Sequence, residues 1–158
     1  MNTYASPLEI STAVVGIDAS RSTSRQRTGT EAYSLYLIRA LLRLPARHHW
    51  RLYFRDVPPP ELFPAADHIE QRIIAFPRLW THLRLGAELV VRPPAGLFVP
   101  AHTRPIFCPT PTVLTVHDLG YLHFPGLHPS GQRAYLHWST RHGARHARLS
   151  VDWPPTCS

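Results

Sequence analysis

The sequence predicts a single α/β domain with a mainly parallel, Rossmann-like sheet flanked by helices. The short and nearly continuous apolar run Val14–Ile17 is typical of a strand that is buried on both faces, and Thr112–Leu119, which lies between Pro111 and Gly120, is the clearest later strand. Longer segments with helical spacing of apolar residues separate these runs, so strands and helices alternate along the chain, as in βαβ units. At 158 residues, the chain has the size of one ordinary domain.

In the first half of the chain, residues 1–12 are polar and aperiodic, and we expect a loose end there. Val14–Ala19 is the first predicted strand. Glu31–Leu44 is a predicted helix because its apolar side chains fill most faces and leave one polar stripe at helical spacing. His49–Arg55 alternates apolar and polar residues, which predicts a second strand.

The second half continues the alternation of strands and helices. The predicted elements are a strand at Arg72–Phe76, a helix at Leu79–Leu89, a short buried strand at Gly96–Pro100, a strand at Thr112–Leu119 and a helix at Pro129–Ala147. The predicted domain therefore covers residues 13–148. Residues 149–158 end in Trp-Pro-Pro-Thr-Cys-Ser, and we expect them to form an atypical, truncated tail.

The charge of the chain points toward anionic partners. Its net charge is +7, and all 17 basic residues are arginines, whose planar guanidinium suits phosphate and carboxylate groups. A coding bias toward arginine would produce the same composition. The arginines are scattered, with no zinc-finger spacing and no aromatic-basic RNA signature, so we do not expect nucleic acid as a partner.

Cysteine usage and hydropathy indicate the compartment. Cys108 and Cys157 lie far apart with no motif around either, which favours a reducing environment. No signal peptide is recognisable, and no apolar stretch reaches the ~20 residues needed to span a membrane. We expect a cytoplasmic protein, with peripheral contact at the inner face of the membrane left open.

An arginine-rich loop follows the first strand. It contains Arg21, Arg25 and Arg27 and leads through Gly29 into a Thr-Glu helix start. Open α/β sheets bind ligands at the carboxyl ends of their strands, and helix N-termini there favour anions. The loop thus predicts a phosphate-bearing or acidic ligand. The alternative is a surface loop whose arginines only keep the protein soluble.

A histidine and an aspartate follow the Thr112 strand, in the run Thr-Val-His-Asp-Leu-Gly-Tyr that contains His117 and Asp118. At that position they would face the same crevice as the arginine loop. A histidine there can order a substrate hydroxyl or transfer protons. The alternative is a structural histidine at the edge of the core, with Asp118 bonding the amides of the turn.

The order of these motifs resembles a known family. The segments GIDASR, RTGTEAYSLYLIRALL, WRLYF, LFVPAH and PTVLTVHDLGYLHFPGLHP, followed by YLHWSTRHGARHA, resemble the N-terminal domain of family-4 (group 1) glycosyltransferases of the GT-B fold. The resemblance covers residues 14–148. It implies that the chain corresponds to the acceptor-side half of a two-domain enzyme whose other half binds the nucleotide sugar.

The resemblance also implies an activity and a set of site residues. The family transfers a sugar from a nucleotide-diphosphate sugar to a saccharide or lipid-linked acceptor in polysaccharide assembly, with retention of configuration and without metal or another cofactor. His117 matches the histidine beside the reacting sugar and is the candidate catalytic residue. The candidate substrate-binding residues are Arg27, Thr28, Gly29, Thr30, Glu31 and Asp118. Of these, Gly29 and Thr30 match the loop that faces the donor, and Asp118 is expected mainly to secure the strand-end turn. Arg27 is not supplied by the resemblance and is our own candidate for an acceptor or phosphate contact near the loop.

The chain also departs from the family, whose members are considerably longer and carry a donor-binding half. We therefore expect an N-terminal fragment that is inactive without the missing C-terminal domain. One alternative is a non-catalytic acceptor- or membrane-binding module that works with a separate donor-binding chain. Another alternative is a degraded product that folds poorly.

Several weaker signals predict no further site. His142 and His146 are four residues apart, a spacing that can hold a metal, but the glutamate of the metalloprotease pattern is absent, so we expect a solvated helix end. No triple-glycine turn and no lysine-containing phosphate loop is present. The aromatic residues Tyr121, Phe124, Tyr135 and Trp138 could line an acceptor surface, although such residues more often belong to a core.

Overall fold

The computed structural model describes residues 13–24, 28–45, 48–75, 81–101, 103–117, 130–147 and 149–152. Of the predicted features, residues 1–12, Arg25, Arg27, Asp118, Tyr121, Phe124 and Cys157 lie outside these ranges. The described elements are β1 (Val14–Asp18), α1 (Gly29–Leu42), β2 (His49–Phe54), β3 (Ile69–Ile73), a π-helical turn η1 (Thr81–Leu85), α2 (Gly86–Val91), β4 (Gly96–Val99), β5 (Thr112–Val116), α4 (Ser130–His146) and β6 (Leu149–Asp152).

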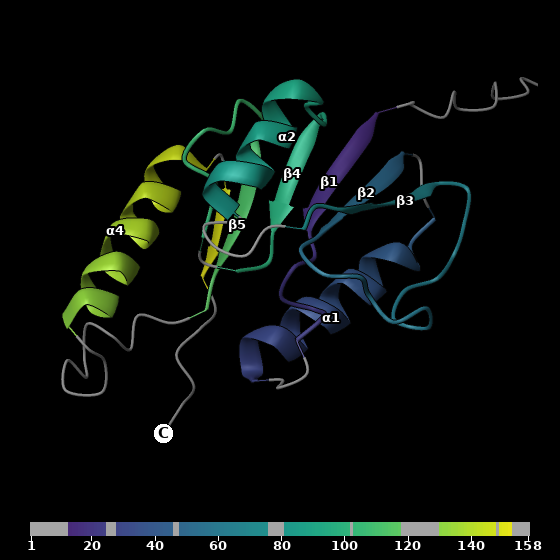
Figure 1. Cartoon of the computed structure of the whole chain (residues 1–158), viewed down its shortest axis with the longest axis horizontal. Helices are drawn as coiled ribbons and strands as arrows, with labels where there is room; N and C mark the ends of the chain where they lie inside the picture. Colours follow the sequence, from purple (N-terminus) through teal and green to yellow (C-terminus); the bar gives the residue numbers. More distant parts are fainter. Residues whose placement is uncertain are drawn as a thin grey trace, which may run out of the picture.

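The strands form one sheet in the order β3-β2-β1-β4-β5-β6 (Figure 1), and each described pair is parallel. The predicted α/β class with a parallel, Rossmann-like sheet is confirmed. From β1 the chain first moves outward through β2 and β3, and it then returns to β4 on the other side of β1. The direction of winding therefore reverses between β1 and β4, and such a reversal opens a crevice at the carboxyl ends of the two strands.

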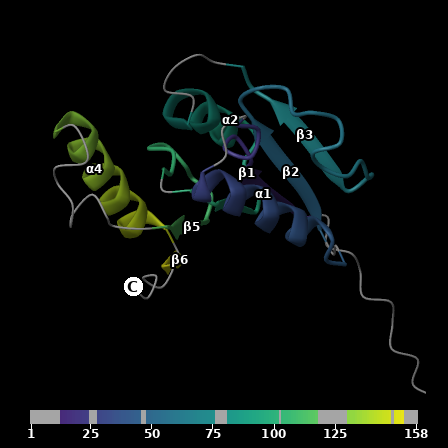
Figure 2. The ribbon, with the colours of Figure 1, turned by 90° about the horizontal axis from the view of Figure 1, so that it is seen from below.

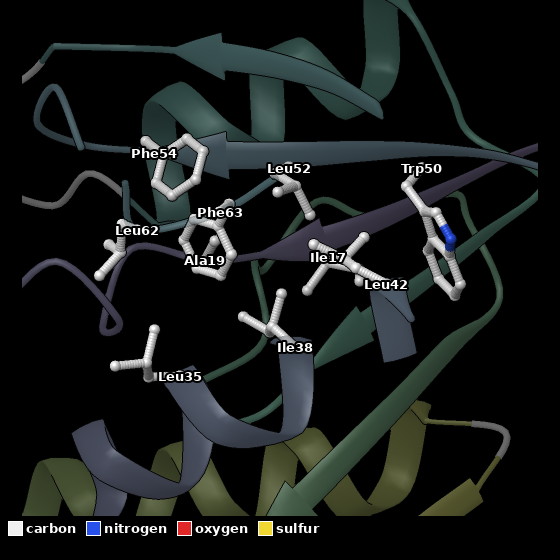
Figure 3. Close-up of a cluster of buried hydrophobic side chains, with 10 residues drawn as sticks. All are labelled: Ile17, Ala19, Leu35, Ile38, Leu42, Trp50, Leu52, Phe54, Leu62 and Phe63. Atoms are coloured by element: carbon white, nitrogen blue, oxygen red, sulfur yellow. The ribbon is translucent and has the colours of Figure 1, made fainter. Parts of the chain in front are cut away.

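Helix α1 packs on one face of the sheet. Its buried side chains Leu35, Ile38 and Leu42 meet Ile17 of β1 and Leu52 of β2 in one apolar cluster (Figure 3). These five residues are at most 6% exposed. Because burial of each such side chain is worth about 1.5–3 kcal/mol, this contact fixes α1, and with it the loop that precedes α1, against the end of β1.

The other face of the sheet carries η1, α2 and a second apolar cluster. Leu85 and Leu89 pack there against Leu97 of β4 and Leu114 of β5. Seen from below, α1 and α2 lie on opposite sides of the strands, and α4 lies beside β5 (Figure 2). In the part of the chain that the structure describes, no helix is both long and apolar enough to cross a membrane.

Three elements differ from the sequence prediction. Strand β3 spans Ile69–Ile73, whereas the prediction placed it at Arg72–Phe76. The predicted helix at Leu79–Leu89 is a π-helical turn followed by the short helix α2. In addition, Leu149–Asp152 forms β6 beside β5, in a segment predicted to be a tail.

The position of β3 follows from its place at the edge of the sheet. An edge strand has one partner and tolerates polar side chains, so its sequence need not be apolar. Glu70 accepts a hydrogen bond from Nε of Arg51 on β2 at 2.6 Å, which matches the pairing of these two residues in the sheet. The apolar run near Ile74 instead closes the strand and enters the core.

Candidate functional site

A cavity of about 310 Å³ lies at the carboxyl ends of β1 and β4, where the winding of the sheet reverses. Its floor comes from β1 and its walls from α1, η1, the loop after β4 and α4. The described residues that line it are Asp18, Ser20, Arg21, Thr30, Glu31, Thr81, Ala101, Thr103, Tyr135 and Leu136. Carboxyl, guanidinium and hydroxyl groups dominate this lining, so the cavity suits a polar ligand.

Asp18 is the last residue of β1 and lies at the bottom of the cavity. It is 5% exposed, and its Oδ1 accepts a hydrogen bond from the backbone N–H of Ser20 at 3.0 Å. Burial raises the pKa of Asp18, and the hydrogen bonds from Ser20 and the charge of Arg21 only partly oppose that effect. A buried carboxyl with a raised pKa, placed in a cavity, is a common feature of functional sites.

At the start of α1, the carboxylate of Glu31 in the first turn places a negative charge beside the helix N-terminus. Thr28 is the N-cap residue, and Oε2 of Glu31 accepts hydrogen bonds from the backbone N–H of Thr28, at 3.1 Å, and from its hydroxyl. Nη1 of Arg21 lies 3.6 Å from the other carboxylate oxygen of Glu31. Burial alone would raise the pKa of Glu31, but the hydrogen bonds from Thr28 and the charge of Arg21 outweigh it, and the pKa is lowered. The positive end of this helix dipole is thus compensated by Glu31.

The lowered pKa of Glu31 predicts a pH-dependent contribution to stability. The ionised carboxylate stabilises the fold above the ordinary value of 4.5, and this contribution is lost as the pH falls through the lowered pKa. Glu31→Gln should reduce the free energy of unfolding at pH 7 by about 1 kcal/mol. Urea unfolding at several pH values measures this difference, which should disappear in acid. The control Glu61→Gln changes an exposed glutamate. An equal loss of unfolding free energy in this variant would contradict the stabilising role of the Glu31 carboxylate.

His117 follows β5 on the side of the sheet that faces α1. Its Nε2 lies 2.9 Å from the carbonyl oxygen of Pro100, and its ring meets the ring of Tyr33 edge to face at 4.6 Å. Since a carbonyl only accepts, Nε2 carries the proton, and in the neutral ring Nδ1 is the acceptor. Ser34 of α1 also lies close to the Pro100 carbonyl, with its Oγ at 3.2 Å. His117 is therefore positioned by α1 and by the end of β4.

The predicted site residues that the structure describes lie at one end of the sheet but do not all line the cavity. Thr30 and Glu31 line it, whereas Thr28 and Gly29 are exposed at the start of α1, outside the lining. His117 is half-buried beside α1 and is not one of the described lining residues. The predictions for Arg27 and Asp118 fall outside the described residues.

A second, larger cavity of about 780 Å³ adjoins the first and shares four of its lining residues. It extends from the end of β1 across the end of β2. Its described lining consists of Ser20, Arg21, Thr23, Ser24, Arg55, Asp56, Val57, Pro59, Thr81, His82 and Tyr135. Arginines from two neighbouring strand ends therefore face one space.

One wall of the larger cavity joins η1 to α4. Nε2 of His82 lies 3.0 Å from the hydroxyl of Tyr135, and the ring of His82 also meets Trp138 edge to face. Burial lowers the pKa of His82, which favours its neutral ring. Tyr135 and Trp138 are 43% and 44% exposed, so the prediction that they belong to a core is wrong, and Tyr135 lines both cavities.

The helix end predicted to be solvated is exposed at Arg145 and His146, as expected, whereas His142 is half-buried. His142 stacks on Trp138, with ring centroids 5.4 Å apart, and it also lies beside His146. Burial, together with the nearby charges of His146, Arg104 and His82, lowers the pKa of His142. Among the described residues, no group of three or more histidine, cysteine, aspartate or glutamate side chains is arranged to hold a metal ion.

Comparisons with known proteins do not assign this site: no family model, no curated protein and no solved structure matches the chain. The site itself offers a buried carboxyl, a capped helix start, a histidine whose Nε2 faces a backbone carbonyl, and two adjoining cavities with hydroxyl and guanidinium groups.

Proposed function

We propose that the described sheet is the acceptor-side domain of a retaining glycosyltransferase that uses a nucleotide-diphosphate sugar. The observation that carries the proposal is the polar cavity at the crevice between β1 and β4, with the start of α1 in its wall. The motifs that resemble the family-4 enzymes, the Thr-Gly-Thr-Glu helix start and the histidine after β5, lie near this end of the sheet, and Thr30 and Glu31 of the first motif line the cavity.

The residues at the crevice suit the recognition of saccharide hydroxyl groups. The carboxylate of Asp18 and the hydroxyl of Thr30 offer hydrogen-bonding groups from two sides of the cavity. In the proposed reaction His117 orders the transferred sugar.

Transfer itself would require a second domain that holds the nucleotide sugar over this edge of the sheet. In that arrangement the domain described here binds the saccharide or lipid-linked acceptor. We propose that it works in the cytoplasm at the inner face of the membrane, where its net charge of +7 would favour an anionic surface.

One observation favours the alternative of a non-catalytic acceptor-binding module. His117 bonds the backbone of Pro100 and packs on Tyr33, and it is not one of the described residues that line the cavity. In this alternative His117 only fastens β5 to α1 and β4. Replacement of His117 by alanine would then leave saccharide affinity unchanged.

The proposal is tested by calorimetric titration of the purified chain with neutral and acidic mono- and oligosaccharides, and separately with nucleotide diphosphates. We expect saccharide binding without added metal. Thr30→Trp, which places a large side chain at the cavity, should reduce saccharide affinity about tenfold or more, since it fills space that the ligand needs.

Ala40→Trp is the matched control, because Ala40 is exposed near the other end of the same helix. Thermal unfolding of both variants establishes that they fold. If a folded chain binds no saccharide, or if Thr30→Trp and Ala40→Trp bind equally well, the proposal is wrong.

A further inference from the structure

We infer that the larger cavity binds an anionic saccharide, one that carries a phosphate or carboxylate group, through Arg21 and Arg55. The inference deepens the proposed function and rests on it, since this ligand would be the acceptor or the part of the acceptor nearest the transferred sugar. The smaller cavity, which lies at the crevice and adjoins the larger one, would then hold the reacting hydroxyl.

The sheet register brings the two arginines together. Asp18 at the end of β1 is paired with Tyr53 of β2, and the backbone N–H of Ala19 donates to the carbonyl of Tyr53 at 2.9 Å. Arg21 follows Asp18 by three residues, and Arg55 follows Tyr53 by two. Both therefore leave the same edge of the sheet from adjacent strands, and both line the cavity of about 780 Å³.

Both arginines retain hydrogen-bond donors for a ligand. Nε of Arg55 donates to Asp56 at 3.0 Å, but the two side chains are 52% and 63% exposed, so water screens this pair. Arg21 is 59% exposed and lies 3.6 Å from Glu31, beyond a good hydrogen-bond distance. Since a guanidinium has five N–H donors, each arginine can bind an oxyanion without losing its present partner.

The anion would bind at the arginines and not at the start of α1. Glu31 already accepts hydrogen bonds from the N-cap residue Thr28, and its negative charge opposes a second anion there. This differs from the sequence prediction, in which the helix N-terminus itself favours the anion. The positive charge in the larger cavity comes instead from Arg21 and Arg55, which follow the neighbouring strands β1 and β2.

The remaining lining suits the sugar part of such a ligand. Ser20, Thr23 and Ser24 supply hydroxyl groups, and the partly exposed ring of Tyr135 offers an apolar face. His82 is 8% exposed, and its buried Nδ1 has no hydrogen-bond partner within the described residues. The volume of about 780 Å³ is within the range of ligand sites.

The test is calorimetric titration with hexose 6-phosphates, hexuronic acids, the parent hexoses and inorganic phosphate, at low and at high salt. We expect an acidic sugar to bind about tenfold or more tightly than its parent hexose. Arg21→Gln and Arg55→Gln should each reduce the affinity for the acidic sugar about tenfold, and this loss should exceed any loss of affinity for the parent hexose.

The control is Arg43→Gln, which removes the same charge from an exposed position at the end of α1. An equal loss of affinity in Arg43→Gln would overturn the inference, because general positive charge would then explain binding. Parent hexoses that bind as tightly as acidic ones would overturn it and leave the proposed function standing. Inorganic phosphate that binds as tightly as the sugar phosphates would overturn the assignment of a saccharide ligand. If none of the neutral or acidic saccharides binds at all, the proposed function fails as well.

Discussion

Replacing Gly16 by alanine is expected to lower the free energy of unfolding by about 1–3 kcal/mol. Gly16 lies in the middle of β1 and faces the second apolar cluster. A Cβ atom there would lie 2.9 Å from Cε2 of Tyr53, 3.0 Å from Cγ of Pro94 and 3.3 Å from Cδ1 of Leu97. The Tyr53 ring is fully buried and cannot move aside cheaply. The position therefore requires glycine because of close packing across the central strands.

Gly29→Ala is the matched control for this prediction. A Cβ atom at Gly29 would meet no heavy atom within 4 Å, and the residue opens α1. The same substitution there should raise the free energy of unfolding by up to about 1 kcal/mol, because alanine loses less entropy on folding. Urea unfolding of both variants measures the two effects. If Gly16→Ala is as stable as the wild type, the close packing described around β1 is wrong.

Replacing Asp18 by asparagine is expected to stabilise the protein at neutral pH, by about 1–3 kcal/mol. Burial raises the pKa of Asp18, so its ionised form carries a free-energy cost in the folded state. Asparagine removes the charge while its side-chain oxygen can still accept the hydrogen bond from Ser20. A residue that reduces stability at the bottom of a cavity is better explained by binding than by folding.

The pH dependence distinguishes this cause from a general packing effect. For an acid with a raised pKa, the cost is present when the pH is above the raised value and disappears toward the ordinary value of 3.8. The stability difference between Asp18→Asn and the wild type should therefore shrink as the pH falls. Chemical unfolding from pH 7 to pH 4 measures this. A constant difference, or a variant that is less stable at neutral pH, contradicts the prediction.

The central elements were predictable because the pattern of apolar residues in each of them follows directly from its burial in the core. Strand β1 and helix α1 are buried against each other, so their apolar patterns match the observed ends within a few residues. The edge strands were not predictable in the same way. A strand such as β3, with one neighbour and exposed polar side chains, resembles a loop in sequence, and the contact between Arg51 and Glu70 that matches its register joins residues from two separate strands.

The candidate site was predictable only where one segment carries it. The start of α1 and the histidine after β5 were recognisable because each motif lies within a few consecutive residues. Arg55, His82 and Tyr135 were not, because they reach the larger cavity from three separate elements. Only the pairing of β1 with β2, and the packing of η1 near α4, bring them together. The compensation of the helix dipole by Glu31 likewise required the folded geometry.

The order of the strands has a consequence for how the chain acquires its structure. Strand β1 is made first, but its two neighbours are β2 and β4, and residues 96–99 of β4 follow β1 by about eighty positions. Parallel pairing of this kind has a high contact order and is slow. Until β4 arrives, one edge of β1 is unpaired, and a growing chain on the ribosome would expose an apolar strand edge that favours aggregation. Coexpression with chaperones should therefore increase the yield of native protein.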